Sequence, residues 1–175
     1  MSSTAFDTTS VTLPGGSVVV VVDPDDGAVV ASGFADLVTV FGFLTGAEQS
    51  RGRRDVPPSS ASVRAVVDAL TAYSDGDVDA LDAVIVRQPG GPFMQRAWAE
   101  LRGVRAGETD SYAGLARRAG SPAAVRAAGQ ACARNHVAPF VPCHRILRTD
   151  GSLGGYAYGL PVKEALLVHE GALLA

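Results

Sequence analysis

A cysteine followed directly by a histidine is the feature of this sequence with the clearest chemical potential. Cys143 and His144 lie in the segment Val141-Pro142-Cys143-His144-Arg145. A cysteine reacts as its thiolate, and an unperturbed thiol with a pKa of about 8.5 is mostly protonated at neutral pH. A neighbouring histidine can remove the thiol proton, directly or through a water molecule. The pair therefore predicts a nucleophilic cysteine with its own base.

A carboxylate near the end of the chain could complete this arrangement. Glu170, in the pair His169-Glu170, can orient His144 and stabilise its charged form if the chain folds back. The alternative is that Cys143 is a buried packing residue, because a lone cysteine in an apolar segment is more often inert. The residue types alone leave both interpretations open.

Length and composition limit the classes of protein to consider. The 175 residues suit one domain or two small lobes, and a hydrophobic content of 47% is enough for a packed core. With two cysteines, Cys132 and Cys143, a disulfide scaffold is not expected, and we predict free thiols in a reducing cytosol. We take Cys132 as a small buried packing residue. Cysteine and histidine are too sparse for a structural zinc site, so no metal is expected.

The sequence contains no recognisable targeting or membrane-spanning segment. Its apolar runs are short, such as Val18 to Val22, and fall far below the roughly 20 residues that cross a bilayer. Residues 1–7 have no basic segment followed by an apolar one. We therefore expect a cytoplasmic protein with no membrane partner.

The charges are distributed unevenly along the chain. The formal net charge is −3, which by itself argues weakly against nucleic-acid binding. One C-terminal stretch with few acids nevertheless carries Arg117, Arg118, Arg126, Arg134, Arg145 and Arg148. A local basic face matters more for phosphate contact than the sum over the chain. A solvated arginine-rich surface is the alternative explanation.

The elements that must position these residues fall into two regions. Residues 1–88 predict an α/β lobe with a small antiparallel sheet and helices, of a ribonuclease H-like kind. Val18 to Val22 and Ala28 to Gly33 are strand-like, and the turn-forming segment Asp23 to Gly27 between them predicts a hairpin. Further along, we expect a helix at Leu37 to Leu44, a loop at Gln49 to Ser60, a helix capped by Ser60 or Ser62 that runs through Tyr73, and a strand at Leu81 to Val86.

Residues 89–175 predict a mainly helical domain, which begins after the linker Gln88 to Pro92. Phe93 to Arg102 has the apolar spacing of a helix. Asp110 or Ser111 can cap a short helix that ends at Gly120, and Ser121-Pro122 can open another to about Arg134. This order is typical of a helix-turn-helix, although many enzymes contain similar helical pairs.

The second half also carries a series of motifs in a recognisable order. They are Gly91–Trp98, Gly107-Glu108-Thr109, Ser111-Tyr112, Ala123–Gly129, Ala133-Arg134-Asn135, Pro142–Arg145, Gly154-Gly155-Tyr156 and Lys163–Leu167. In order and spacing this half resembles the 6-O-alkylguanine-DNA alkyltransferases, also called methylated-DNA–protein-cysteine methyltransferases. The first half resembles them only in size and element order.

The resemblance implies roles in DNA recognition. The second helix of the helix-turn-helix is expected in the minor groove of double-stranded DNA, with Ala127, Ala128 and Gly129 as its small contact face. Arg126 is expected to enter the duplex and fill the space of the flipped nucleotide, because the reacting carbon is otherwise buried in the base stack. Tyr112 is expected at the base and its flanking phosphate. The resemblance further implies a monomer in solution that can bind side by side on DNA.

The resemblance also implies roles in chemistry. Cys143 is the expected acceptor of the alkyl group, His144 its water-mediated base and Glu170 the residue that orients His144. Asn135 is expected to shape the turn beside Cys143, and Arg145 to hold the surrounding loop rather than to act chemically. The base-binding loop is expected to include Gly155, Tyr156, Ala157 and Tyr158.

The sequence departs from the family pattern at three places. His136 stands where many members have proline, which could change local rigidity. Arg105-Ala106-Gly107 replaces a proline-containing turn. Tyr158 stands where some members have glycine, and a bulky side chain there could disfavour large adducts such as benzyl groups.

The implied reaction is single-turnover repair of alkylated guanine, and by extension of 4-O-alkylated thymine, without a cofactor. Three other classes remain open on the residues alone. One is a damage-sensing protein that binds alkylguanine without transfer, another is a transcription factor that uses the helix-turn-helix alone, and the third is an unrelated cysteine hydrolase. Only single-turnover alkyl transfer, and none of these three classes, predicts a product that stops at one equivalent per protein.

Overall fold

The computed structural model describes residues 4–175 and consists of two compact units. The first runs to Gln88 and also takes in His136–Ala138, whereas the second comprises Pro89–Asn135 and Pro139–Ala175. The segment His136–Ala138 belongs to the first unit because it pairs with Ser32. The Ser32 amide donates to the His136 carbonyl at 2.8 Å, and its hydroxyl donates to the Ala138 carbonyl at 2.7 Å.

The first unit contains a four-stranded mixed sheet in the order β3-β2-β1-β4. The strands are β1 (Phe6–Leu13), β2 (Gly16–Val22), β3 (Val29–Gly33) and β4 (Arg53–Asp55). The expected antiparallel pairing holds for β1, β2 and β3 but is wrong for β4, which pairs parallel to β1. Helices α1 (Leu37–Phe41) and α2 (Gly46–Gln49) carry the chain across before β4, and such a crossover allows parallel pairing. The segment expected to be a loop, residues 49–60, therefore contains a strand.

The predicted hairpin of β2 and β3 is confirmed. Asp23 donates its amide to the Ala28 carbonyl at 2.9 Å, which closes the turn. Gly27 has a φ of 75°, a conformation that costs glycine far less than other residues. The turn thus follows from local chemistry. Strand β1, which pairs with the other edge of β2, was not predicted.

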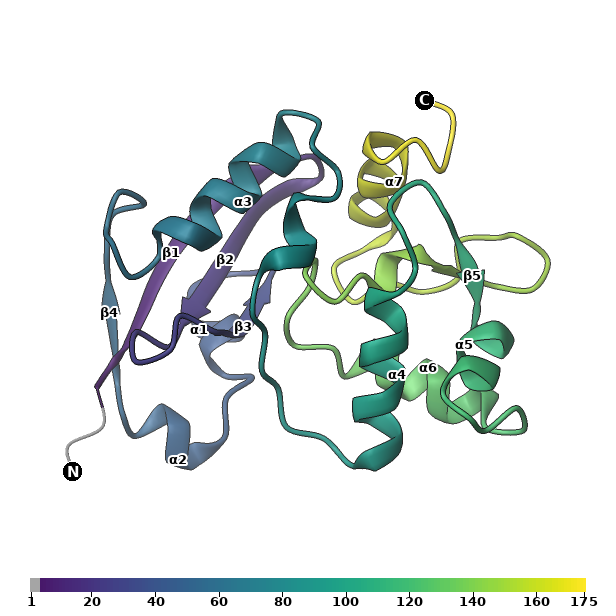
Figure 1. Cartoon of the computed structure of the whole chain (residues 1–175), viewed down its shortest axis with the longest axis horizontal. Coiled ribbons are helices and arrows are strands. Elements are labelled where there is room, and N and C mark those ends of the chain that lie inside the picture. Colours follow the sequence, from purple (N-terminus) through teal and green to yellow (C-terminus); the bar gives the residue numbers. More distant parts are fainter. Residues whose placement is uncertain (1–3) are drawn as a thin grey trace. The chain divides into compact units, whose positions relative to one another are not determined.

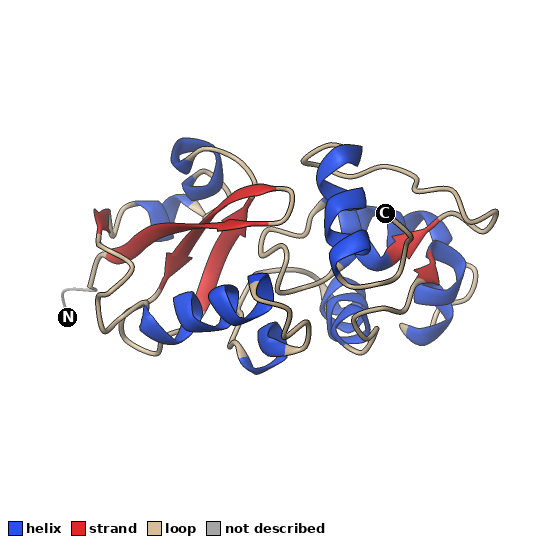
Figure 2. Ribbon diagram, turned by 90° about the horizontal axis from the view of Figure 1, so that it is seen from above, coloured by secondary structure: helices blue, strands red, loops and turns tan. Residues whose placement is uncertain are grey.

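Alternation along β2 directs its side chains to two buried faces. Val18, Val20 and Val22 point to one face and Val21 to the other, and all of them are fully buried. Val21 packs with Phe6 and Val40 of α1 in one core cluster. Figure 2 shows α1 and α3 (Arg64–Ser74) on opposite sides of this sheet. A valine run rather than strict alternation is therefore what this strand requires.

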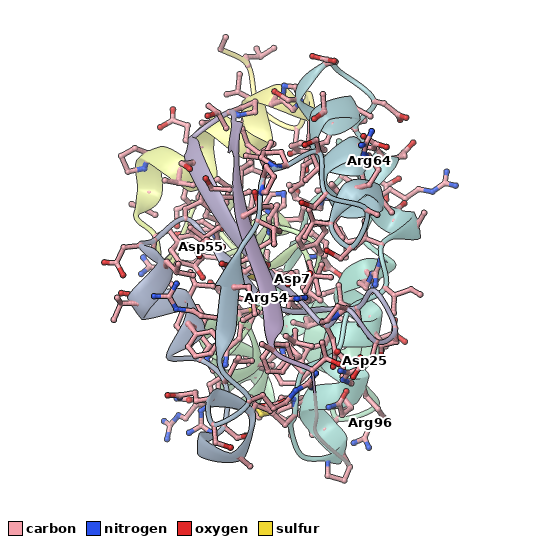
Figure 3. All side chains as sticks on the ribbon, turned by 90° about the vertical axis from the view of Figure 1, so that its left-hand side faces the viewer. Asp7, Asp25, Arg54, Asp55, Arg64 and Arg96 are labelled. Atoms are coloured by element: carbon pink, nitrogen blue, oxygen red, sulfur yellow. The ribbon has the colours of Figure 1, made fainter. Side chains whose placement is uncertain are left out.

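Polar contacts join the edge of the sheet to the segment that precedes α3. Asp7 on β1 pairs with Arg54 on β4 at 2.7 Å, and both residues are labelled in Figure 3. The Ser62 hydroxyl donates to the Asp7 carboxylate at 2.5 Å. Ser62 is therefore not the expected N-cap: α3 begins at Arg64, and its N-cap residue Val63 makes no side-chain cap.

The strand expected at residues 81–86 is also wrong. Ala80–Ala83 forms a 3-10 helix, and Val86 makes only an isolated bridge to Val29. The spacing explains the difference, because Leu81 and Val84 are buried whereas Ile85 is 63% exposed. The buried positions three residues apart suit a 3-10 turn better than a strand.

The second unit is mainly helical, with one short parallel strand pair (Figure 1). Its elements are α4 (Pro92–Arg102), β5 (Asp110–Ser111), α5 (Tyr112–Arg118), α6 (Val125–Ala133), a 3-10 helix (Cys143–Arg145), β6 (Ile146–Leu147) and α7 (Leu160–His169). Helix α4 packs against α5 and α6. It buries Trp98, whose indole N–H donates to the Ala131 carbonyl at 2.9 Å. No helix within residues 4–175 is long and apolar enough to cross a membrane.

The ends of α5 and α6 follow the sequence only in part. Ser111 caps α5 as predicted, since its hydroxyl accepts from the Gly114 amide at 3.0 Å, and Gly120 follows the helix with a φ of 81°. Helix α6 begins later than expected, at Val125. Residues 121–124 instead form a turn in which the Ala124 amide donates to the Ser121 carbonyl at 2.8 Å.

The departures from the family pattern have local explanations. The His136 amide donates to the Gln88 side chain at 2.9 Å, a bond that proline could not make. The His136 ring also stacks on Phe43 with centroids 4.4 Å apart. At the second departure, Arg105-Ala106-Gly107, the Glu108 amide donates to the Arg105 carbonyl at 3.0 Å, and Gly107 has a φ of 84°.

Candidate active site

Cys143 begins a 3-10 turn and is held there by Asn135. The Asn135 side-chain amide donates to the Cys143 Sγ at 3.2 Å and to the Val141 carbonyl at 2.7 Å. Asn135 thus fixes both the nucleophile and the backbone that leads to it. The resemblance implied that Asn135 shapes the turn beside Cys143, and the structure brings the two side chains into contact.

The sulfur environment keeps Cys143 protonated at rest. Burial raises the pKa of the Cys143 thiol, while the Asn135 hydrogen bond and the positive charge of Lys163 act in the opposite direction. Asn135 and Lys163 favour the thiolate because they stabilise negative charge on sulfur. The site therefore needs a base to remove the proton as the thiol reacts.

His144 and Glu170 form a buried pair, as the sequence anticipated. The His144 Nε2 lies 2.9 Å from the Glu170 Oε1, and His144 is 1% exposed. If Nε2 carries the proton, Nδ1 is left as an acceptor. Nδ1 has no hydrogen-bond partner among the described residues. Burial lowers the pKa of His144, opposed by the hydrogen bond and charge of Glu170, so the imidazole is neutral at rest and able to take a proton.

Arg145 binds the same carboxylate. Its Nε and Nη2 each lie 2.9 Å from the Glu170 carboxylate, and its Nη1 donates to the Val104 carbonyl at 2.6 Å. Burial alone would raise the pKa of Glu170, but the hydrogen bond and charge of His144, together with those of Arg145, lower it to about 2. Glu170 is therefore ionised throughout the neutral range.

An apolar cavity of about 310 Å³ opens onto Cys143. It is lined by Tyr112, Gly129, Cys132, Ala133, Cys143, Gly155, Tyr156 and Ala157. Four residues expected near the base, namely Tyr112, Gly155, Tyr156 and Ala157, thus line one cavity with the nucleophile. Cys132, expected to be a buried packing residue, is only partly buried and lines this cavity as well.

Tyr158 lies next to this lining without being part of it. Its ring packs edge to face against Tyr156, with centroids 5.6 Å apart. Burial raises the pKa of Tyr158. Tyr158 therefore supports one wall of the cavity through Tyr156.

The sequence did not predict a role for Lys163 at this site. It is fully buried, and its Nζ donates to the carbonyls of Ile146 at 2.6 Å, Leu153 at 2.5 Å and Gly155 at 3.3 Å. The ammonium thus ties strand β6 to the loop that lines the cavity. A lysine on the same face of a helix as buried leucines was the available signal, because buried lysines need such partners.

Helix α6 presents part of the small-residue face expected to contact DNA. Arg126 is exposed, and Ala127 and Gly129 are partly exposed. Ala128 is fully buried and does not belong to this face. Positions 128 and 131 are three residues apart on the helix, and both pack inward.

The comparisons with known proteins agree with this geometry. Residues 92–172 match the family model described as 6-O-methylguanine DNA methyltransferase, DNA binding domain. The chain therefore carries, in residues 92–172, the DNA-binding domain of the 6-O-methylguanine DNA methyltransferase family. Within the family, it is 40% identical over 107 residues to a methylated-DNA–protein-cysteine methyltransferase of Salmonella typhimurium, a match that covers 61% of this chain and 63% of the relative. The matched region thus spans less than two thirds of that relative's length.

Two matches to Mycobacterium tuberculosis, one in sequence and one in structure, extend the comparison. The methylated-DNA–protein-cysteine methyltransferase of Mycobacterium tuberculosis is 39% identical over 110 residues, which is 63% of this chain and 66% of the relative. The crystal structure of Mycobacterium tuberculosis OGT in complex with DNA superposes with a TM-score of 0.75 at 28% identity, covering 95% of this chain and 93% of that chain. The likeness to this family member therefore includes the first unit, where the sequence alone provided weak support.

Proposed function

We propose that this protein repairs alkylated DNA by moving an alkyl group from the 6-oxygen of guanine to the Sγ of Cys143, once per molecule. The observation that carries the proposal is a cysteine thiol at an apolar cavity, held by Asn135 and followed by the buried His144–Glu170 pair. The family membership of residues 92–172 supports the same reaction.

The proposed chemistry is a direct displacement at the alkyl carbon. The thiol proton passes to His144 through a water molecule, and Glu170 stabilises the imidazolium that results. The sulfur forms a bond to the alkyl carbon as the bond from that carbon to the guanine oxygen breaks, and guanine keeps the electron pair. Tyr112, a cavity residue whose pKa is raised by burial, is the candidate proton donor to guanine.

The product explains why each molecule acts once. A thioether on Cys143 is not hydrolysed by water or by an ordinary base, so the acceptor is consumed. The atoms balance without a metal ion or an organic cofactor. The same displacement applies to the 4-oxygen of alkylated thymine, which we include as a second substrate.

We propose that DNA is bound through helices α5 and α6 acting as a helix-turn-helix, with α6 in the minor groove. The exposed small residues Ala127 and Gly129 allow close approach to a narrow groove, and Arg126 precedes them on the helix. Base flipping brings the alkylated guanine to Cys143. We further propose a cytoplasmic monomer that can bind side by side on DNA, in which a ribonuclease H-like lobe (residues 1–88) supports a DNA-binding and acceptor domain (residues 89–175).

Intact-protein mass is the direct test. The protein is mixed with a short duplex that contains 6-O-methylguanine, and peptide mapping locates any added mass. We expect one methyl group on Cys143 and never more than one per molecule, even with excess duplex. Repeated turnover without a mass change would instead indicate a hydrolase.

One observation favours a second candidate, a damage sensor that binds alkylguanine without transfer. Cys143 is buried, and its pKa is raised by that burial, so its reactivity depends on His144. An unchanged mass, combined with tighter binding of the alkylated duplex than of its unmodified twin, would support the sensor.

Replacement of Arg126 is expected to slow transfer from duplex DNA. Without a side chain to fill the gap left by the flipped nucleotide, Arg126→Ala should lose about 1–3 kcal/mol of transition-state stabilisation, or roughly 5- to 160-fold in rate. Transfer from free 6-O-methylguanine should be unaffected, because no stack has to be opened. Single-turnover rates on both substrates test this, with the exposed Gln130→Ala on the same helix as control. An unchanged duplex rate would remove the assignment.

Replacement of Tyr158 is expected to widen the range of adducts. Tyr158 supports the wall of the cavity formed by Tyr156, so Tyr158→Gly should let that wall move. We expect the rate with 6-O-benzylguanine to rise about tenfold relative to the rate with 6-O-methylguanine, since about 1–2 kcal/mol of steric cost is relieved. Competition between the two free bases measures the ratio. Equal handling of both adducts by the unaltered protein would contradict a size limit.

A further inference from the structure

A second hollow adjoins the cavity that contains Cys143. It is open, with a volume of about 710 Å³, and is lined by Tyr112, Val125, Arg126, Gly129, Arg148 and Gly155. Tyr112, Gly129 and Gly155 line the Cys143 cavity as well. These residues form the common border of the two hollows, and two of the three are glycines. At these two glycines the border has no side chain, so a bound chain can pass closely from one hollow to the other.

The two hollows differ sharply in charge. Among the residues that the structure describes, no charged side chain lines the Cys143 cavity, whereas the second hollow is lined by Arg126 and Arg148 and by no acidic residue. Within residues 4–175, neither of these guanidinium groups lies within 4.0 Å of a carboxylate. Asp150, the acid nearest to Arg148 along the chain, accepts from the Ser152 amide at 3.0 Å and from its hydroxyl at 2.7 Å. These hydrogen bonds lower the pKa of Asp150, and the positive charge of Arg148 contributes to the same effect. The second hollow is thus a cationic site open to solvent.

Arg148 is held at this site by its backbone and by packing. Its amide donates to the Ser152 carbonyl at 2.9 Å, and its carbonyl accepts from Gly151 at 2.9 Å. Gly154 has a φ of +69°, and a Cβ built there would lie 3.3 Å from the Tyr112 Oη and 3.4 Å from the Arg148 Cγ. The Tyr112 and Arg148 side chains therefore both pack against Gly154. This contact places the arginine stem beside the phenol at the border of the hollows.

We propose that Arg148 binds a DNA phosphate that flanks the flipped nucleotide. The inference rests on the proposed transfer from a flipped base. With the base at Cys143, its sugar and phosphates must lie outside the apolar cavity. The border shared with the second hollow offers them a path that leads to the Arg148 guanidinium. Arg126 is assigned to the gap in the duplex, which leaves Arg148 for the phosphate. A guanidinium matches phosphate oxygens in a two-pronged geometry. Arg148 thereby acts as a positioning residue rather than a catalytic one.

The test compares a substrate that has phosphates with one that lacks them. Single-turnover transfer is measured for the unaltered protein and for Arg148→Ala, Arg148→Lys and Arg105→Ala, the last being an exposed arginine on another loop that serves as control. Arg148→Ala should be about tenfold slower on a 6-O-methylguanine duplex at low salt and unchanged on free 6-O-methylguanine. Arg148→Lys should recover part of the duplex rate, because it keeps the charge without the two-pronged geometry.

Salt dependence supplies an independent readout. For duplex binding, the slope of log K against log salt should become less steep by about 0.9 in Arg148→Ala and stay unchanged in Arg148→Lys. An unaltered slope and duplex rate would overturn the proposal. An equal loss on free base and duplex would also overturn it, because the effect would then lie in the cavity and not at a phosphate. If the unaltered protein transfers nothing from either substrate, the proposed function fails, while the slope still decides whether Arg148 binds phosphate.

Discussion

Cys143→Ala should take up no alkyl group from a 6-O-methylguanine duplex while still binding that duplex. The reason is chemical: the proposed reaction ends as a thioether on the Cys143 sulfur, and alanine offers no nucleophile. Binding should persist because the proposed DNA contacts lie on α6 and in the hollow lined by Arg126 and Arg148. Intact-protein mass checks the first expectation, and a gel-shift titration with alkylated and unmodified duplexes checks the second.

Cys132→Ala is the matched control for this experiment. Cys132 lines the same cavity, but burial and the neighbouring Cys143 raise the pKa of its thiol, and no base comparable to His144 follows it in the sequence. This variant should still gain one methyl group per molecule. A methyl group gained by Cys143→Ala, or lost in Cys132→Ala, would move the acceptor to Cys132.

Glu170→Gln should destabilise the fold by about 3–5 kcal/mol at neutral pH. Glu170 is 6% exposed and accepts hydrogen bonds from Arg145 at 2.9 Å, so its neutralisation leaves the Arg145 charge buried and unpaired. Loss of one partner from such a pair typically costs this much. Urea unfolding at pH 7 provides the measurement. The exposed Glu164→Gln on α7 is the control and should change stability by less than about 0.5 kcal/mol.

The same pair predicts how stability depends on pH. The folded pKa of Glu170 is lowered from 4.5 to about 2, so the folded state stabilises the ionised carboxylate. Its contribution is fully present above pH 4.5 and is lost as the pH falls toward about 2. The difference in unfolding free energy between the unaltered protein and Glu170→Gln should therefore shrink across this window. A difference that stays constant with pH would show that the ion pair is not its source.

The same variant should also slow alkyl transfer. The Glu170 carboxylate favours the charged form of His144, and a neutral amide would weaken the base that receives the Cys143 proton. The pH profile of transfer separates this effect from simple unfolding, since a weaker base requires a higher pH for the same rate.

Local physical chemistry allowed several features to be predicted from the sequence. The β2–β3 turn follows from its own residues, with Gly27 in the conformation that glycine tolerates best. Ser111 caps α5 through a bond to an amide three residues away. Asn135, Cys143 and His144 are close in sequence, and short loops keep them close in space. The order of motifs in residues 91–167 resembles that of the family whose DNA-binding domain matches residues 92–172.

Tertiary structure decided the features that depend on residues far apart in the chain. The parallel pairing of β4 with β1 depends on the crossover through α1 and α2. The local sequence pattern of a strand does not specify which edge of the sheet it joins. The burial of Ala128 depends on which face of α6 meets its neighbours. The bonds from Lys163 to carbonyls of Ile146, Leu153 and Gly155 arise only when β6, the loop and α7 have packed. The sequence determined the reactive residues and their local turns, because these turns depend on hydrogen bonds between residues a few positions apart. Only the folded chain lets His144 and Arg145 share the Glu170 carboxylate, because a buried carboxylate needs such partners.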